Sequence, residues 1–347
     1  MSTTHLETRR NKILEFTIQT YVETAQPVGS HEVCRRFHLR VSPATVRNVM
    51  GQLERDALLT HPHTSAGRVP TQRGYRYYVD LLMAPQRLSD PELRAVQALA
   101  DEIGDDPWEL LRQAARVLAV LSGQASMTFS LPMAEGIFRR LELIPMAPHR
   151  VLGILMTTDG LFKQVFLELQ ETVDAAEIAR LSRFFNEELS GALLGGVSER
   201  LQQALMDATN ALNYLYKRAS DVWALGDFAG QEATLFVDGV SHVLMQPEFR
   251  DARQAHHLLQ QLEHRETLAR LLAETVRQGR SRIMIGSELG TSGMEHCSVV
   301  SAPYRVGTRV AGAVSVLGPA RMDYPKVVHL VDEVAAILGR AMEHFAA

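Results

Sequence analysis

The side chains with the clearest chemistry gather just after position 41. Ser42, Ala44, Thr45, Arg47 and Asn48 place a hydroxyl pair, a small residue, a guanidinium and an amide in one short stretch. In the DNA major groove a guanidinium matches the acceptors of guanine, and an amide matches the donor and acceptor of adenine. At the start of a helix, these residue types indicate a surface that reads double-stranded DNA.

A basic, glycine-containing segment follows directly and adds a second group of candidate contacts. Gly67 predicts a turn with unusual backbone angles between two short strands, and arginines beside such a turn can hold DNA phosphates. Thr71 is expected to cap a further helix. The residues predicted to contact DNA in this group are His63, Thr64, Ser65, Gly67, Arg68, Thr71 and Arg76.

The pattern alone leaves other uses of this segment open. A three-helix unit with a hairpin also serves as a protein-docking module, so an interaction-only role remains an alternative to DNA binding. His61 and His63 have no third ligand near them in the sequence, which favours turn residues over a metal site.

The sequence contains none of the common catalytic motifs that we looked for. The sequence has no Gly-x-Ser-x-Gly elbow, no Walker loop and no His-Glu-x-x-His pair. Cys34 and Cys297 are far apart, which argues against a disulfide framework and a structural zinc site. Arg321 and Asp323 could pair and stiffen the turn before the last helix. We therefore expect no enzyme, no cofactor and no metal.

Three predicted helices must position the first group. Apolar residues recur at helical spacing from 6 to 24, a short helix follows from Ser30 to about 37, and a third begins after Ser42 with Pro43 at its first position. On the third helix, one face carries Val46, Val49, Met50 and Leu53. The opposite face then points the predicted DNA contacts away from the core.

Helices and strands alternate in blocks through the rest of the chain. We expect α+β structure, because strands lie on both sides of a helical block whose leucine and phenylalanine stripes predict a dimer surface or an internal packing face. The predicted helices are 90–121, broken near 104–107, two within 174–225, 253–278 and 325–344. The predicted strands are 137–144, 151–157, 162–169, 233–237, 241–244, 282–285, 297–304 and 308–317.

Charge divides the chain into a basic head and an acidic body. Residues 1–80 hold 11 Lys+Arg against 7 Asp+Glu, and the remaining residues hold 25 against 33, within a net charge of -4. A basic head suits a nucleic-acid partner. Because no long apolar run or apolar signal core is present, we expect a cytoplasmic protein without a membrane partner.

The chain resembles the HrcA family of bacterial heat-inducible transcription repressors. It departs from the usual family pattern at Pro43 and at Ala57, where a glycine is common. The matching stretches are residues 28–30, 42–54, 62–71, 74–80, 237–239, 246–249, 285–288 and 318–324.

The resemblance implies a multidomain architecture and a regulatory role. It implies a winged helix-turn-helix DNA-binding domain at 1–84, a GAF-like α+β domain at 90–171 and 231–347, and an inserted helical dimerisation subdomain at 172–230. It also implies a homodimer that represses chaperone genes from an inverted-repeat operator called CIRCE, ahead of chaperonin and DnaK operons, under control of the GroE chaperonin. A small-molecule sensor in the GAF-like domain and direct sensing of heat remain alternatives.

Overall fold

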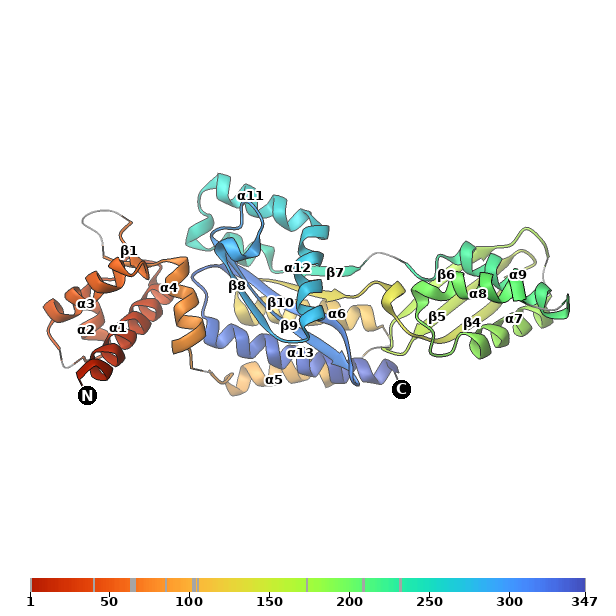
Figure 1. Ribbon diagram of the computed structural model, residues 1–347, viewed down its shortest axis with the longest axis horizontal. Coiled ribbons are helices and arrows are strands. Elements are labelled where there is room, and N and C mark those ends of the chain that lie inside the picture. The colour runs from red at the N-terminus through yellow and green to blue at the C-terminus, as the bar shows by residue number, and fades with distance from the viewer. Residues whose placement is uncertain are drawn as a thin grey trace.

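The computed structural model is elongated, with three units in a row (Figure 1). It describes residues 2–346 apart from 40, 63–66, 85, 102, 103, 105, 173, 208, 209, 231 and 232. An N-terminal unit lies at one end, a five-stranded sheet with its helices forms the middle, and a three-stranded sheet with its helices lies at the other end. No described helix has the length and apolar character needed to cross a membrane.

The N-terminal unit consists of helices around a small apolar core and a two-stranded antiparallel ribbon. The predicted inner face of the third helix is confirmed at Val46, Met50 and Leu53, which are buried against α1 and α2. Val49 on the same helix is half-buried. The elements are α1 Ser2–Thr24, α2 Ser30–Arg36, α3 Pro43–Arg55, β1 Leu59–Thr60, β2 Val69–Pro70, α4 Gln72–Tyr77 and a π-helical turn at Tyr78–Leu82.

The middle unit is an antiparallel sheet in the order β7-β3-β10-β9-β8 with helices on both faces. Neighbouring residues point to opposite faces, so Val300 packs toward α13 whereas Val299 packs toward α12. Its strands are β3 Ala125–Ser130, β7 Thr234–Asp238, β8 Arg282–Ile285, β9 Cys297–Val306 and β10 Arg309–Pro319. Its main helices are α5 Asp90–Asp101, α6 Pro107–Ser122, α11 Ala252–Glu263, α12 Arg265–Gln278 and α13 Tyr324–Ala346.

The third unit carries its own sheet, which corrects the predicted boundary of the insertion. Strands β4, β5 and β6 pair only with one another in the described part of the chain, and α7 covers β4. The predicted 90–171 and 172–230 segments therefore divide a single packed unit, because the inner side chains of β4 pack on α7. The elements are β4 Phe138–Ala147, β5 Arg150–Thr157, β6 Phe162–Glu168, α7 Ala175–Glu188, α8 Val197–Asp207 and α9 Asn210–Gly226.

Local predictions differ from the structure at three further places. The segment predicted as a strand at 241–244 is the helix α10 Val240–Leu244. The helix predicted at 253–278 is interrupted at His264, whose backbone angles of φ -76° and ψ 72° are not helical. Strand β3 was not predicted, and it is buried along its whole length. Its buried hydroxyl groups form hydrogen bonds inside the protein; the Thr128 hydroxyl, for example, donates to the Leu111 carbonyl at 2.9 Å.

Candidate nucleic-acid interface

The start of α3 is fixed by a cap. The Ser42 hydroxyl accepts a hydrogen bond from the Thr45 backbone N–H at 3.2 Å and lies 3.0 Å from the Thr45 hydroxyl. Pro43 occupies the first turn, where a missing N–H has no cost. The predicted helix start is confirmed, and both hydroxyls sit at the helix end that a DNA groove would receive.

One face of α3 is exposed and polar. Ala44, Arg47 and Asn48 are exposed, and neither Arg47 nor Asn48 makes a hydrogen bond or ion pair within the described residues. Gln52 and Arg55 continue the same exposed face toward the helix end. Sequence reasoning missed these two, although their spacing of four and seven residues from Asn48 places them on its side of the helix.

The ribbon beside α3 is held by a third extended segment. Val28 and Arg68 exchange backbone hydrogen bonds of 2.8 and 2.9 Å. Gly67 lies so close to this segment that a Cβ would sit 2.6 Å from the Val28 carbonyl atoms. This close approach of the backbone leaves no room for a side chain and therefore requires glycine here. The predicted contacts His63, Thr64 and Ser65 lie outside the described residues.

Arg68, which is predicted to contact the DNA backbone, has two side-chain partners within the N-terminal unit. Its guanidinium lies 3.0 Å from the Glu54 carboxylate and 2.8 Å from His61 Nδ1, and its side chain is only 18% exposed. His61 Nε2 in turn lies 3.2 Å from Glu54. If Arg68 donates to Nδ1, the remaining imidazole proton is on Nε2 and faces Glu54. The three side chains tie the ribbon to α3.

Thr71 and Arg76 also have structural partners. The Thr71 hydroxyl accepts from the Gly74 N–H at 3.0 Å and donates to the Ala57 carbonyl at 2.6 Å, which confirms the predicted cap of α4. Arg76, which is predicted to contact DNA, binds the middle unit in this structure: it pairs with Glu288 and donates to the Ile283 carbonyl at 2.7 Å.

The environment of Arg76 keeps it charged at this junction. Burial acts to lower the pKa of Arg76, but the hydrogen bonds and charges of Glu288 and Asp80 outweigh it, and the net pKa is raised. The guanidinium therefore bridges two units as a permanent cation.

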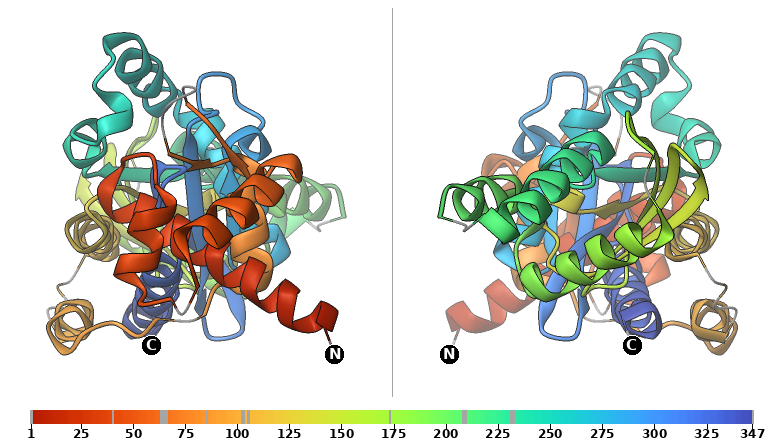
Figure 2. Two further views of the ribbon diagram at one scale, coloured as in Figure 1. Left: turned by 90° about the vertical axis from the view of Figure 1, so that its left-hand side faces the viewer. Right: turned by 90° about the vertical axis from the view of Figure 1, so that its right-hand side faces the viewer.

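A second contact between the N-terminal and middle units centres on Arg321. It donates to Glu248 at 2.6 Å, to the Gln246 side chain at 3.0 Å and to the Val22 carbonyl of α1 at 2.5 Å. The predicted pairing with Asp323 is not formed; instead burial raises the pKa of Asp323. These two contacts join α4 and α1 to the middle unit, which lies behind the N-terminal unit in the left view of Figure 2.

Comparison with known proteins identifies the family of the chain. The model described as "HrcA protein C terminal domain" matches residues 108–328. The "Heat-inducible transcription repressor HrcA" of Geobacter sulfurreducens is 35% identical over 98% of this chain and 99% of its own. The chain belongs to the HrcA family.

Other HrcA relatives and one solved structure extend the match over all three units. The repressor of the same name from Symbiobacterium thermophilum is 34% identical over 96% of this chain and 98% of its own. The crystal structure of a protein titled hypothetical has a TM-score of 0.64 over 97% of this chain and 98% of its own, at 21% identity. The family resemblance predicted from the sequence is confirmed, and the overall arrangement of units also occurs in an experimental structure.

Proposed function

We propose that the chain is a repressor of heat-shock genes. The observation that carries this proposal is the full-length similarity to HrcA relatives named heat-inducible transcription repressors, which covers the N-terminal unit as well as the body. By analogy with the family, the regulated genes encode chaperones, the operator is the inverted repeat CIRCE, and the GroE chaperonin modulates activity. Such a repressor works where the chromosome is, in the cytoplasm.

The N-terminal unit is, in this proposal, a winged helix-turn-helix. Helix α3 enters the major groove with Ala44, Arg47 and Asn48 toward base edges, while Ser42 and Thr45 lie near the backbone. The guanidinium of Arg47 and the amide of Asn48 are exposed and have no partner among the described residues, which supports this assignment. The two-stranded ribbon of β1 and β2 is, in this proposal, the wing. Gln52 and Arg55 extend the contact toward flanking phosphates.

The middle unit is proposed to be GAF-like and the third unit to form the dimer. The apolar stripe of α7, with Ile178, Leu181 and Phe185, is buried inside its own unit, so it does not supply the predicted dimer surface. The open face of the three-stranded sheet is the better candidate. There the row Ile144, Leu152 and Phe166 crosses all three strands, and Ile144 and Phe166 are 41% and 56% exposed.

The test is release from the operator on heating. Purified chain is bound to a labelled fragment from upstream of the chaperonin genes of its own organism, and binding is followed by fluorescence anisotropy during warming, with and without GroE. We expect specific binding that GroE strengthens. Equal affinity for a fragment with a shuffled inverted repeat would contradict the repressor assignment, and release unaffected by GroE would favour direct sensing of heat.

A further inference from the structure

Strand β7 is an edge strand whose outer side is open. It pairs with β3 from Ser126↔Asp238 to Ser130↔Thr234, and no strand pairs with its other side in the part of the chain that the structure describes. At the opposite edge, Arg76 and Gln72 of α4 cap the Ile283 and Ile285 carbonyls of β8, whereas on β7 the Leu235 carbonyl alone accepts from a side chain, that of Arg265, within the described residues. The free N–H and C=O groups of an edge strand are a template for a further extended chain.

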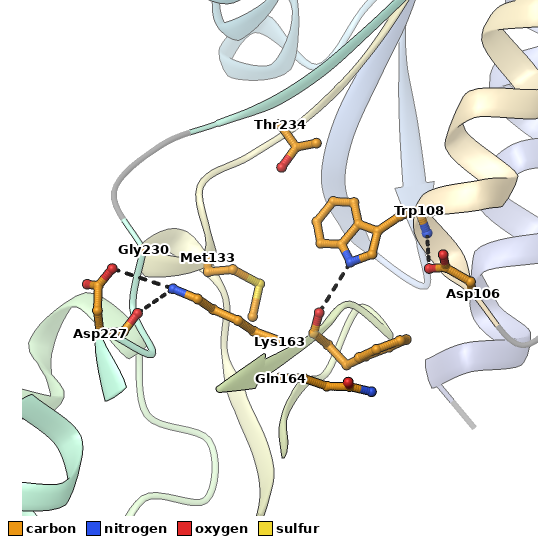
Figure 3. Close-up of a pocket in the computed structure, with 9 residues that line it drawn as sticks. Asp106, Trp108, Met133, Lys163, Gln164, Asp227, Gly230 and Thr234 are labelled. Atoms are coloured by element: carbon orange, nitrogen blue, oxygen red, sulfur yellow. Dashed lines mark hydrogen bonds and ion pairs between the residues drawn. The ribbon is translucent and has the colours of Figure 1, made fainter. Parts of the chain in front are cut away.

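Two cavities run along β7 and meet at Thr234, which lines both. One has a volume of 410 Å³ and lies between β7 and α6, beside Arg112 and Arg116. The other has a volume of 880 Å³ and opens at the junction with the third unit, beside Trp108 and Met133 (Figure 3). We call the two cavities together the β7 groove. Its larger cavity places Trp108 and Met133 beside the charged side chains of Asp106, Lys163 and Asp227, and its smaller cavity, the basic end, is lined by Arg112, Arg116 and Arg265.

In the larger cavity, a hydrogen bond holds the Trp108 ring in place. The Trp108 indole N–H donates to the Phe162 carbonyl at 3.3 Å, which fixes the ring at the mouth of the larger cavity (Figure 3). Met133 lines the same cavity and adds an adaptable apolar surface. Lys163 lies 3.5 Å from the Asp227 carboxylate, so the nearby cation is neutralised locally. This end suits a large apolar side chain.

The basic end offers guanidinium groups with spare donors. Arg116 is 73% exposed and reaches Asp238 only at 3.8 Å, and Arg265 makes a single 3.3 Å bond to the Leu235 carbonyl. Arg112 is more constrained, since it pairs with Glu109 and lies 5.1 Å over the Phe236 ring. Arg116 and Arg265 are thus the groups able to bind carboxylates beside the strand.

We propose that this groove binds an extended acidic segment of a partner protein. The segment adds to the sheet beside β7, places a large apolar side chain against Trp108, and directs its carboxylates to Arg116 and Arg265. A second copy of this chain fits poorly, because pairing two β7 edges about a two-fold axis would bring their arginines together. The inference goes beyond repression and does not depend on it.

The test uses the full-length chain and a defined peptide. The chain has two tryptophans, and Trp223 is buried between Phe185 and Phe228, so Trp223→Phe leaves Trp108 as the fluorescent reporter. The probe is a short peptide of alternating valine and glutamate with one terminal phenylalanine. We expect saturable binding with a shift in Trp108 emission. Absence of binding, or equal binding of a peptide with lysine in place of glutamate, would overturn the proposal.

Two further arms separate strand addition from charge attraction alone. A probe methylated on the backbone nitrogens of one edge cannot complete a ladder and should lose binding; unchanged affinity would overturn strand addition. Arg116→Glu should weaken binding about fivefold, because repulsion replaces attraction at an exposed site. The matched control is Arg180→Glu on the exposed side of α7, which should bind as the parent chain does.

A measurement of the oligomeric state tests whether a second copy of this chain occupies the groove. Arg116→Glu should leave the sedimentation mass unchanged, with circular dichroism confirming the fold. A lower mass would show that a second copy occupies the groove, and that result would overturn the assignment to a partner's segment.

Discussion

Arg47 is the residue on which recognition of DNA most depends in this account. Because it has no partner in the described residues, Arg47→Ala should leave the unfolding temperature unchanged. It should cost about 1 to 3 kcal/mol of affinity for the inverted repeat if the guanidinium contacts a base. Anisotropy titrations over a range of salt separate the roles, since losing a phosphate contact lowers the salt slope by about 1 and a base contact does not.

The control for Arg47 is an arginine on another exposed helix face. Arg94 on α5 is exposed and has no partner in the described residues, so Arg94→Ala removes the same charge from the same chain. Equal loss of affinity in both variants would mean that net charge, rather than the α3 face, determines binding.

Ala57 adopts a backbone conformation that suits glycine better. Its φ is 56°, where an L-residue is strained by roughly 1 to 2 kcal/mol. Ala57→Gly relieves that strain but loosens the unfolded chain by about 0.4 to 1 kcal/mol. We expect a net gain of about 0.5 to 1 kcal/mol in the free energy of unfolding. Denaturant titrations measure this free energy. The control is Ala100→Gly on the exposed face of α5, which should lower the free energy of unfolding. If Ala57→Gly also lowers it, the backbone of Ala57 is not strained.

Residues with local partners could be predicted, and residues with distant partners could not. The Ser42 cap depends on a residue three positions away, so its pattern was visible in the sequence. Arg76 pairs with Glu288, which is 212 positions away. Nothing in the order of the residues distinguishes such an arginine from one that meets a phosphate.

Helix α4 links the DNA-facing ribbon to the edge of the middle sheet. Gln72 donates to the Ile285 carbonyl at 2.7 Å, and Arg76 pairs with Glu288, so α4 holds the ribbon in a fixed place on the body. Both partners of the ion pair are partly exposed. We therefore expect a coupling energy of about 1 kcal/mol or less in a double-mutant cycle of Arg76→Ala and Glu288→Ala.

The readout for this pair must distinguish local from global effects. Hydrogen exchange should accelerate at α4 in either single variant, while the strands of the middle sheet keep their protection. Arg112→Ala, which removes a pair within α6, is the matched control and should leave α4 unchanged. If the changes in the free energy of unfolding caused by the two single variants add up to the change in the double variant, Arg76 does not couple the two units.

Helices and strands could be predicted where the apolar periodicity is strong. The prediction failed where pairing with distant strands determines the structure. Helix α3 has a clear apolar face, and the break between α5 and α6 is marked by Pro107. Strand β3 has no alternation because both its faces are buried. Strands β4 to β6 were found, but their sheet was not, since pairing partners are not written in a strand's own sequence.

At the scale of the whole molecule, a dimer that binds an inverted repeat has two DNA-binding domains, and the two copies must contact each other through another part of the chain. The open face of the three-stranded sheet lies at the opposite end of the molecule (Figure 1). Phe166→Lys should weaken that contact and lower the sedimentation mass at micromolar concentration, because it places a charge in an apolar row. Val120→Lys, at an exposed apolar site on α6, should leave the mass unchanged; a stable Phe166→Lys dimer would place the interface elsewhere.

A footprint on the DNA upstream of the chaperonin genes of the same organism tests the central claim most directly. We predict two protected half-sites related by inverted symmetry, with their centres separated by about one or more turns of the double helix, as two α3 helices of a dimer require. Arg47→Ala should erase the protection, and Arg94→Ala should preserve it. An unprotected inverted repeat, or the same footprint with Arg47→Ala, would contradict the account.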